Sequence, residues 1–151
     1  MEKTLILQQV KNLWNTNMAF NQLLGLNITQ FNHQQSEVRF VWQDNLVGNP
    51  MQKILHGGVT ATALDLVGGV VAAASIIEQL EAYTPESIEQ SLSKLSTIDL
   101  RTDYLRPGRG EEFIATARII RSGSKVTVAR MELHNEKNHH IAFGTGTYMV
   151  G

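Results

Sequence analysis

The sequence contains no cysteine, only three prolines among its 151 residues, and 7% aromatic residues. The lack of cysteine excludes disulfides, thiolate metal ligands and cysteine nucleophiles, and it is compatible with a cytoplasmic location. Lysine and arginine number 13 while aspartate and glutamate number 14, so neither sign of charge is in excess. We therefore expect a globular chain that binds neither nucleic acid nor anionic lipid.

Long hydrophobic runs are also missing. The longest, over residues 66–77, has 12 residues, whereas about 20 are needed to cross a bilayer. The first residues lack the basic and apolar regions of a signal peptide. We expect no membrane span, a cytoplasmic protein, and one domain over residues 1–151, because a domain has about 150 residues.

Hydrophobic periodicity predicts an α+β fold. Apolar spacing indicates a helical segment over residues 1–25, and residues 57–82 form a central helix that is apolar nearly all round. Thr84-Pro85 begins a polar surface helix that ends near residue 95. Period-two patterns and turn residues predict strands over 26–31, 36–43, 97–105, 111–121, 125–134 and 140–149. We expect consecutive strands to be antiparallel neighbours in one curved sheet that wraps around the central helix.

His56-Gly57-Gly58 lies where a loop becomes the central helix. The first backbone N–H groups of a helix lack intrahelical acceptors and carry the positive end of the dipole. Two glycines would let a ligand approach them, so the Gly57 N–H could stabilise a developing oxyanion. The alternative is that the glycines only permit a tight turn.

Asp65 is the one ionisable residue between His56 and Glu78. A carboxylate in an apolar helix must be hydrogen-bonded, paired, shifted in pKa or placed at a wet cleft, which makes it a functional candidate. A structural hydrogen bond to a strand or a partner chain is the alternative. Ala61, Gly69 and Ala73 share its row on the helix, leaving little bulk there.

The spacing between His56 and Asp65 bears on oligomeric state. Nine positions correspond to about 900° of rotation and about 13.5 Å of rise, so the two side chains point apart within one chain. If both serve one reaction, the simplest arrangement places the helix start of one chain opposite Asp65 of another. This predicts composite sites in a homodimer.

Three motifs resemble those of PaaI-like hotdog-fold acyl-CoA thioesterases: His56-Gly57-Gly58 with Asp65, then residues 103–108 (DYLRPG), then residues 121–125 (RSGSK). The resemblance covers residues 36–149, and within the group the chain is most similar to the bacterial YigI branch. It implies a hotdog fold, hydrolysis of medium- and long-chain acyl-CoA, and a homodimer or homotetramer.

The resemblance also implies roles for individual residues. The Gly57 amide would polarise the thioester carbonyl, Asp65 of the other subunit would attack it or activate water, and His56 would orient the helix start. Relatives often carry an amide six residues before this histidine, a position that Pro50 occupies here. We therefore select Asn49 for that role, with Gln52 as the alternative.

The substrate-binding positions follow from the same resemblance. Thr97 falls where the family has a short hydroxyl near the attacking water, and Gly58 lies at the helix start. The positions that would contact coenzyme A are Tyr104, Arg106, Arg109, Arg121, Gly123, Ser124 and Lys125. The basic members suit its phosphates, although basic residues at turns are also ordinary solvated surface.

Other chemistry is poorly supported. His134, His139 and His140 straddle a turn without a neighbouring acid at a familiar ligand spacing, so we expect surface histidines and no metal. No serine-hydrolase elbow, phosphate loop or dinucleotide fingerprint occurs, which predicts no cofactor. Two alternatives to a thioesterase stay open: a non-catalytic acyl-CoA or lipid-binding module, and, ranked last, a hotdog dehydratase or hydratase that uses His56 with Asp65.

Overall fold

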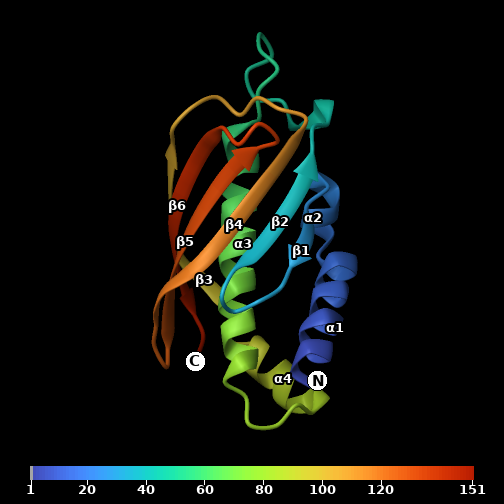
Figure 1. Cartoon of the computed structure of the whole chain (residues 1–151), viewed down its shortest axis with the longest axis vertical. Coiled ribbons are helices and arrows are strands. Elements are labelled where there is room, and N and C mark those ends of the chain that lie inside the picture. The colour runs from blue at the N-terminus through green and yellow to red at the C-terminus, as the bar shows by residue number, and fades with distance from the viewer. Residues whose placement is uncertain (1) are drawn as a thin grey trace.

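The computed structural model describes residues 2–151, which form four α-helices and one six-stranded antiparallel sheet (Figure 1). Met1, where we began the N-terminal helical segment, lies outside these residues. The helices are α1 (Glu2–Asn17), α2 (Ala19–Leu24), α3 (Gly57–Glu78) and α4 (Pro85–Leu92). The strands are β1 (Asn27–Gln30), β2 (Ser36–Val41), β3 (Ser96–Tyr104), β4 (Glu112–Ser122), β5 (Val126–Asn135) and β6 (His140–Met149). The predicted α+β class and all six predicted strands are confirmed.

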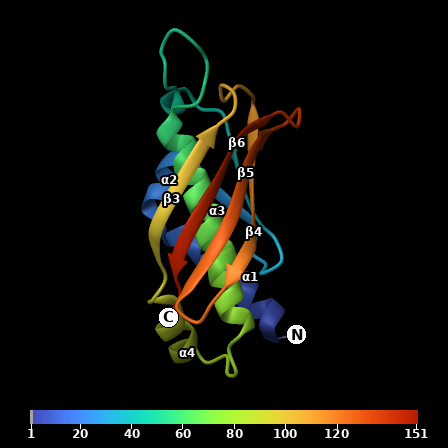
Figure 2. The ribbon, with the colours of Figure 1, turned by 90° about the vertical axis from the view of Figure 1, so that its left-hand side faces the viewer.

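The strand order corrects one expectation. The sheet runs β1-β2-β4-β5-β6-β3, so β3 is not a neighbour of β2 or β4 but pairs with β6 at the far edge. The reason is α3, which lies along one face of the sheet and separates β2 from β3 in the chain (Figures 1 and 2). The chain leaves β2 near one edge, and after α3 and α4 it returns at the other.

The central helix α3 forms the core with the sheet. Its buried residues are Val59, Thr60, Ala63, Leu64, Leu66, Val67, Gly68, Val70, Val71, Ala72, Ala73, Ala74 and Ile77. Among the described residues, α3 is the helix long and apolar enough to cross a membrane, but 67% of its most apolar window is buried in the fold. It is therefore the core helix of this fold.

α3 is less completely wrapped than its composition suggested. Ala61, Thr62, Asp65 and Gly69 are only half-buried. Asp65 lies four residues after Ala61, three after Thr62 and four before Gly69, so the four residues form a strip along one side of the helix. Ala73, which we placed in the same row, is buried in the core. The helix also ends at Glu78 rather than residue 82, because the amides of Gln79 and Leu80 turn back to the carbonyls three residues earlier.

The outer helices are fixed by a few specific contacts. Lys3 of α1 forms an ion pair with Glu78 at the end of α3, at 2.8 Å. α4 begins as predicted at Thr84, whose hydroxyl accepts from the Ser87 N–H at 3.1 Å in a reciprocal capping box. α4 is more than a surface excursion, because Ile88 and Leu92 pack against the core.

Tyr148 of β6 is a buried side chain whose place depends on two glycines. A Cβ on Gly68 would overlap its hydroxyl and lie 2.8 Å from its Cζ, and a Cβ on Gly146 would lie 2.6 Å from its Cε2. Both distances are too short for real contacts. The ring therefore occupies space that only glycine leaves free on α3 and on its own strand.

The neighbouring glycines of α3 give a matched test of this packing. We expect Gly68→Ala to lower the free energy of unfolding by about 1–3 kcal/mol through overpacking. Gly69→Ala places its Cβ at an ordinary 3.8 Å from Tyr148 Cε1 and should instead raise stability by up to about 1 kcal/mol, because alanine favours a helix interior. Urea denaturation measures the free energy of unfolding of both variants. Equal changes in the two would contradict the tight packing of Tyr148 against Gly68.

Candidate active site

The start of α3 presents an open backbone amide. His56 is the N-cap, and its Nδ1 accepts a hydrogen bond from the Gly58 N–H at 2.8 Å. The His56 carbonyl accepts from the Val59 N–H at 2.9 Å. Within residues 2–151 the Gly57 N–H has no acceptor, and Gly57 is exposed. The cap thus satisfies the amide after Gly57 and leaves the Gly57 amide free for a ligand.

Tyr104 packs on the same helix start. Its hydroxyl donates to the Gly57 carbonyl at 2.6 Å, and partial burial raises the pKa of Tyr104, so the hydroxyl keeps its proton at neutral pH. Beside Gly57 lies a pocket of about 260 Å³, which Tyr104, Leu105 and Arg106 also line. Gly57 is therefore held through its carbonyl, while its amide has no acceptor among the described residues.

Asp65 lies two turns further along α3, in the half-buried strip. Its Oδ1 accepts from the Thr97 hydroxyl at 2.9 Å and from the Tyr148 hydroxyl at 3.3 Å, and Tyr148 also donates to the Asp65 carbonyl at 3.0 Å. Burial and the nearby carboxylate raise the pKa of Tyr148, so this hydroxyl stays neutral and remains a donor. No described residue donates to Oδ2, which leaves that oxygen available.

A groove of about 510 Å³ opens at Asp65. Its lining is mostly apolar and comes from α2 and the residue before it, from α3 and from β3: Met18, Ala19, Phe20, Asn21, Ala61, Thr62, Leu66 and Leu100. Asp65 is therefore a half-buried group at an open groove, and it is also hydrogen-bonded, so two of the expected alternatives apply together. Contact with solvent at the groove avoids the free-energy cost of burying a charge on an apolar helix.

The two parts of the site are separated within one chain. Gly57 and Asp65 lie on one continuous helix, eight residues and about 12 Å apart along its axis. Gly57 faces Tyr104, whereas Asp65 faces Thr97 and Tyr148. One chain thus forms two half-sites, one with an amide donor and one with a carboxylate.

The predicted coenzyme A residues fall into two groups. Tyr104 and Arg106 lie at the start of α3, and Arg109 lies nearby, where its guanidinium donates to the Gln52 side chain. Gly123 and Ser124 instead border a pocket at the far end of α3, near Ser75 and Gln79. Arg121 and Lys125 flank that turn and are exposed. A single chain does not bring the two groups together.

The amide candidates before His56 have local partners. Asn49 Oδ1 accepts from the Met51 N–H at 3.0 Å, which makes a turn of the loop. Gln52 is engaged by Arg109. Neither side chain contacts Asp65 in the structure. Their assignment to the reaction stays a prediction.

Two features escaped the sequence reasoning. Tyr148 holds Asp65, but no spacing in the sequence links a strand residue to a helix 83 positions away. Sequence spacing predicts surface histidines with no neighbouring acid at a familiar ligand spacing, whereas in the fold Glu132 lies beside His134 and His140, which are half-buried. Pairing of β5 with β6 creates this cluster, which sequence spacing does not reveal; His139 alone is exposed as expected.

Comparison with known proteins now identifies the family. A model of the Thioesterase superfamily matches residues 52–142, which include the start of α3, Asp65 and Thr97. The chain belongs to the thioesterase superfamily. The predicted resemblance is confirmed, and with it the hotdog fold of a curved sheet around a central helix.

Individual relatives of this thioesterase agree. The medium/long-chain acyl-CoA thioesterase YigI of Escherichia coli is 48% identical over 134 residues, covering 89% of this chain and 86% of that protein. A crystal structure from Shewanella oneidensis, described as related to the thioesterase superfamily, is 49% identical with a TM-score of 0.93 and covers 99% of this chain and 97% of its own. A Haemophilus influenzae thioesterase at 20% identity and a TM-score of 0.73 shares the fold, with coverages of 95% and 88%.

The N-cap at His56 can be tested by stability. Removing a side-chain acceptor from an N-cap costs about 1 kcal/mol, within a range of about 0.5–2. We expect this loss for His56→Ala in urea denaturation. His56→Asn should recover most of it, because asparagine is a strong N-cap. Equal losses in the two variants would show that the ring does not act as a cap.

Proposed function

We propose that this thioesterase hydrolyses medium- and long-chain acyl-CoA to a fatty acid and coenzyme A. The observation that carries the proposal is Asp65, which two hydroxyl donors hold at the mouth of a mostly apolar groove. An apolar groove suits a fatty acyl chain. A carboxylate at its mouth suits the reacting carbonyl. The 48% identity with a medium/long-chain acyl-CoA thioesterase supports the same substrate class.

The Gly57 amide is proposed as the electrophilic half of the mechanism. The thioester carbonyl oxygen accepts from the Gly57 N–H, which lies at the positive end of the α3 dipole. As the carbonyl carbon becomes tetrahedral, its oxygen gains negative charge and this hydrogen bond strengthens. Two features support the role: the amide has no acceptor within residues 2–151, and Tyr104 fixes the carbonyl of the same residue.

Asp65 is proposed as the second half. As a general base it takes a proton from water, whose oxygen attacks the carbonyl carbon and displaces the coenzyme A thiolate. As a nucleophile it forms an anhydride that water then hydrolyses. Both routes consume one water and release a fatty acid and a thiol. Thr97 and Tyr148 keep the carboxylate oriented in either route.

A homodimer completes the site in this proposal. Since Gly57 and Asp65 of one chain are about 12 Å apart on α3, the start of α3 in one copy must meet Asp65 of the other. The edge strand β3 supports such an arrangement, because it is largely exposed and carries Thr97. An exposed sheet edge is a ready surface for another strand. Assembly of two dimers into a tetramer is compatible with the same contact.

The same arrangement unites the two groups of coenzyme A residues. If two antiparallel α3 helices place Gly57 of one beside Asp65 of the other, the end of the second helix extends about 20 Å beyond that Gly57. The turn with Arg121 and Lys125 lies at this end. A bound coenzyme A that extends from the site would then run past Arg106 and Arg109 toward the corresponding turn of the partner copy.

We place the enzyme in the cytoplasm, which its lack of cysteine supports.

Asp65→Asn tests the reaction directly. The amide oxygen still accepts from the Thr97 and Tyr148 hydroxyls, so the fold should be retained. Loss of a general base or nucleophile should lower kcat by at least about 10²-fold. Free thiol release from acetyl-, hexanoyl-, decanoyl-, palmitoyl- and benzoyl-CoA measures both turnover and chain-length preference. Wild-type binding of acyl-CoA without turnover would instead favour the non-catalytic binding module.

Gly57→Pro removes the proposed oxyanion donor while sparing the helix. Proline is favoured at the first helical position, and His56, with φ −59° and ψ 135°, already has a conformation allowed before proline. We expect kcat to fall by about 10²–10³-fold. Gly57→Ala is the matched control, because it adds the Cβ, 3.4 Å from the Tyr104 hydroxyl, but keeps the N–H. Comparable activity in both variants would exclude the Gly57 amide.

A further inference from the structure

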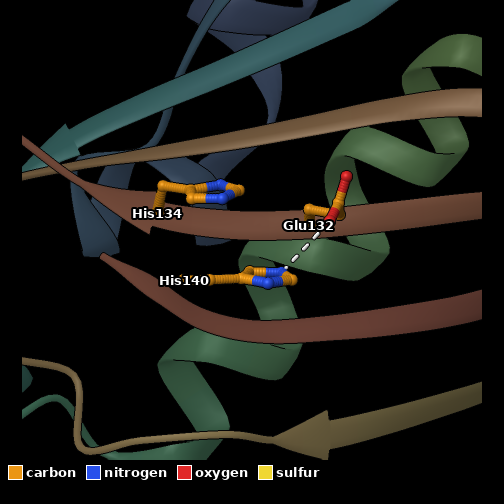
Figure 3. A group of neighbouring side chains, drawn as sticks. All are labelled: Glu132, His134 and His140. Carbon is orange, nitrogen blue, oxygen red and sulfur yellow. Dashed lines mark ion pairs between the residues drawn. The ribbon is translucent and has the colours of Figure 1, made fainter. Parts of the chain in front are cut away.

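A second cluster of chemically active side chains lies on the sheet face away from α3. Glu132 and His134 are two residues apart on β5, and their neighbours Met131 and Leu133 are buried in the core. Side chains alternate between the faces of a strand, so Glu132 and His134 share the outer face. His140 of β6 is the direct cross-strand partner of His134. Figure 3 shows the three side chains gathered on the two adjacent strands.

The spacing of this cluster is close to that of a metal site. One ligand atom from each of the three residues lies within 4.8 Å of the others, and His140 Nε2 is 3.1 Å from Glu132 Oε1. Zinc binds imidazole nitrogen and carboxylate oxygen at about 2.0–2.2 Å, which puts two ligands of one ion about 3–3.5 Å apart. Glu132 and His140 already have that separation.

His140 Nε2 gives an independent reason to expect a ligand. This nitrogen is shielded from solvent and makes no hydrogen bond within residues 2–151. Its approach to Glu132 is short but lacks hydrogen-bond geometry. The contact with Glu132 is an ion pair only when the His140 ring is protonated. A neutral ring leaves this shielded nitrogen without a hydrogen bond, which costs free energy, and a bound cation would satisfy both the nitrogen and the carboxylate.

We propose that Glu132, His134 and His140 bind a divalent transition-metal ion, of which Zn²⁺ is the best match. Two imidazoles and one carboxylate form a set that zinc accepts, with a fourth position for water. The rings of His134 and His140 now stack at 4.4 Å and 7°, and parallel rings cannot both aim a nitrogen lone pair at one ion. Binding therefore turns one ring about its Cβ–Cγ bond, a torsion with a broad energy minimum.

The expected role is structural. The three ligands come from the end of β5 and the start of β6, on either side of residues 136–139. A bound ion would therefore cross-link the two strands of this hairpin, β5 and β6, beside their turn. The site lies across the sheet from Asp65 and Tyr148, so it contributes no group to thioester hydrolysis.

Zinc titration with matched variants tests the proposal. Chelator-treated protein is titrated with Zn²⁺ by calorimetry, alongside Glu132→Gln, His134→Gln and His140→Gln. Since loss of a residue that only orients a ligand weakens metal binding about 10–100-fold, loss of a ligand should weaken it at least about tenfold. His139→Gln is the control, because His139 lies in the same hairpin but outside the cluster; its affinity should equal that of the wild type.

The titration has outcomes that overturn the proposal. The proposal would be overturned if the folded wild type bound no zinc. It would also be overturned if His139→Gln lowered the zinc affinity as much as the variants of the cluster, because that would indicate unspecific binding by surface histidines. Circular dichroism checks that every variant is folded. Histidine NMR signals provide a second readout: zinc should shift His134 and His140 but not His139. Thiol release from decanoyl-CoA should be the same with and without bound zinc.

Discussion

A straight helix fixes the distances between its own residues, and this constraint governs the whole arrangement of α3. Its first amide and its carboxylate are eight residues and about 12 Å apart, and they face different neighbours. No rearrangement of side chains within one chain brings an oxyanion held by Gly57 to Asp65. The proposed reaction, in which both groups serve one site, therefore needs two copies of the chain. The exposed edge strand β3 and the two separate groups of basic residues are consistent with it.

The second constraint is the cost of placing a carboxylate on an apolar core helix. The fold meets this cost with two hydroxyl donors and a groove open to solvent. One donor, Tyr148, reaches Asp65 only because Gly68 and Gly146 leave space for its ring. Two glycines in the core are thus linked to the orientation of the proposed catalytic group. The packing of the core around Tyr148 and the orientation of Asp65 therefore depend on the same side chain.

Much of this architecture was predictable from local patterns. Period-two alternation and turn residues gave all six strands, and the Thr84-Pro85 pair gave the start of α4. The loop before Gly57 and the lone Asp65 supplied the two halves of the proposed site. These features depend on residues that are close together in the chain, which is why they can be predicted from the sequence.

Long-range pairing could not be read in the same way. The place of β3 beside β6 depends on where α3 delivers the chain, the bond from Tyr148 to Asp65 spans 83 positions, and the Glu132, His134 and His140 cluster exists only because β5 pairs with β6. Sequence spacing did not reveal this cluster for the same reason. Each of these contacts joins residues whose separation in sequence has no relation to their separation in space.

Complementation between two inactive variants tests the shared site most directly. Gly57→Pro and Asp65→Asn chains are unfolded, mixed in equal amounts and refolded together. A mixed dimer then contains one site with both defects and one with neither, so random assembly should restore about a quarter of wild-type thiol release if each site combines two chains. A mixture no more active than the separate variants would contradict the account, because it would mean that both residues serve the site within one chain.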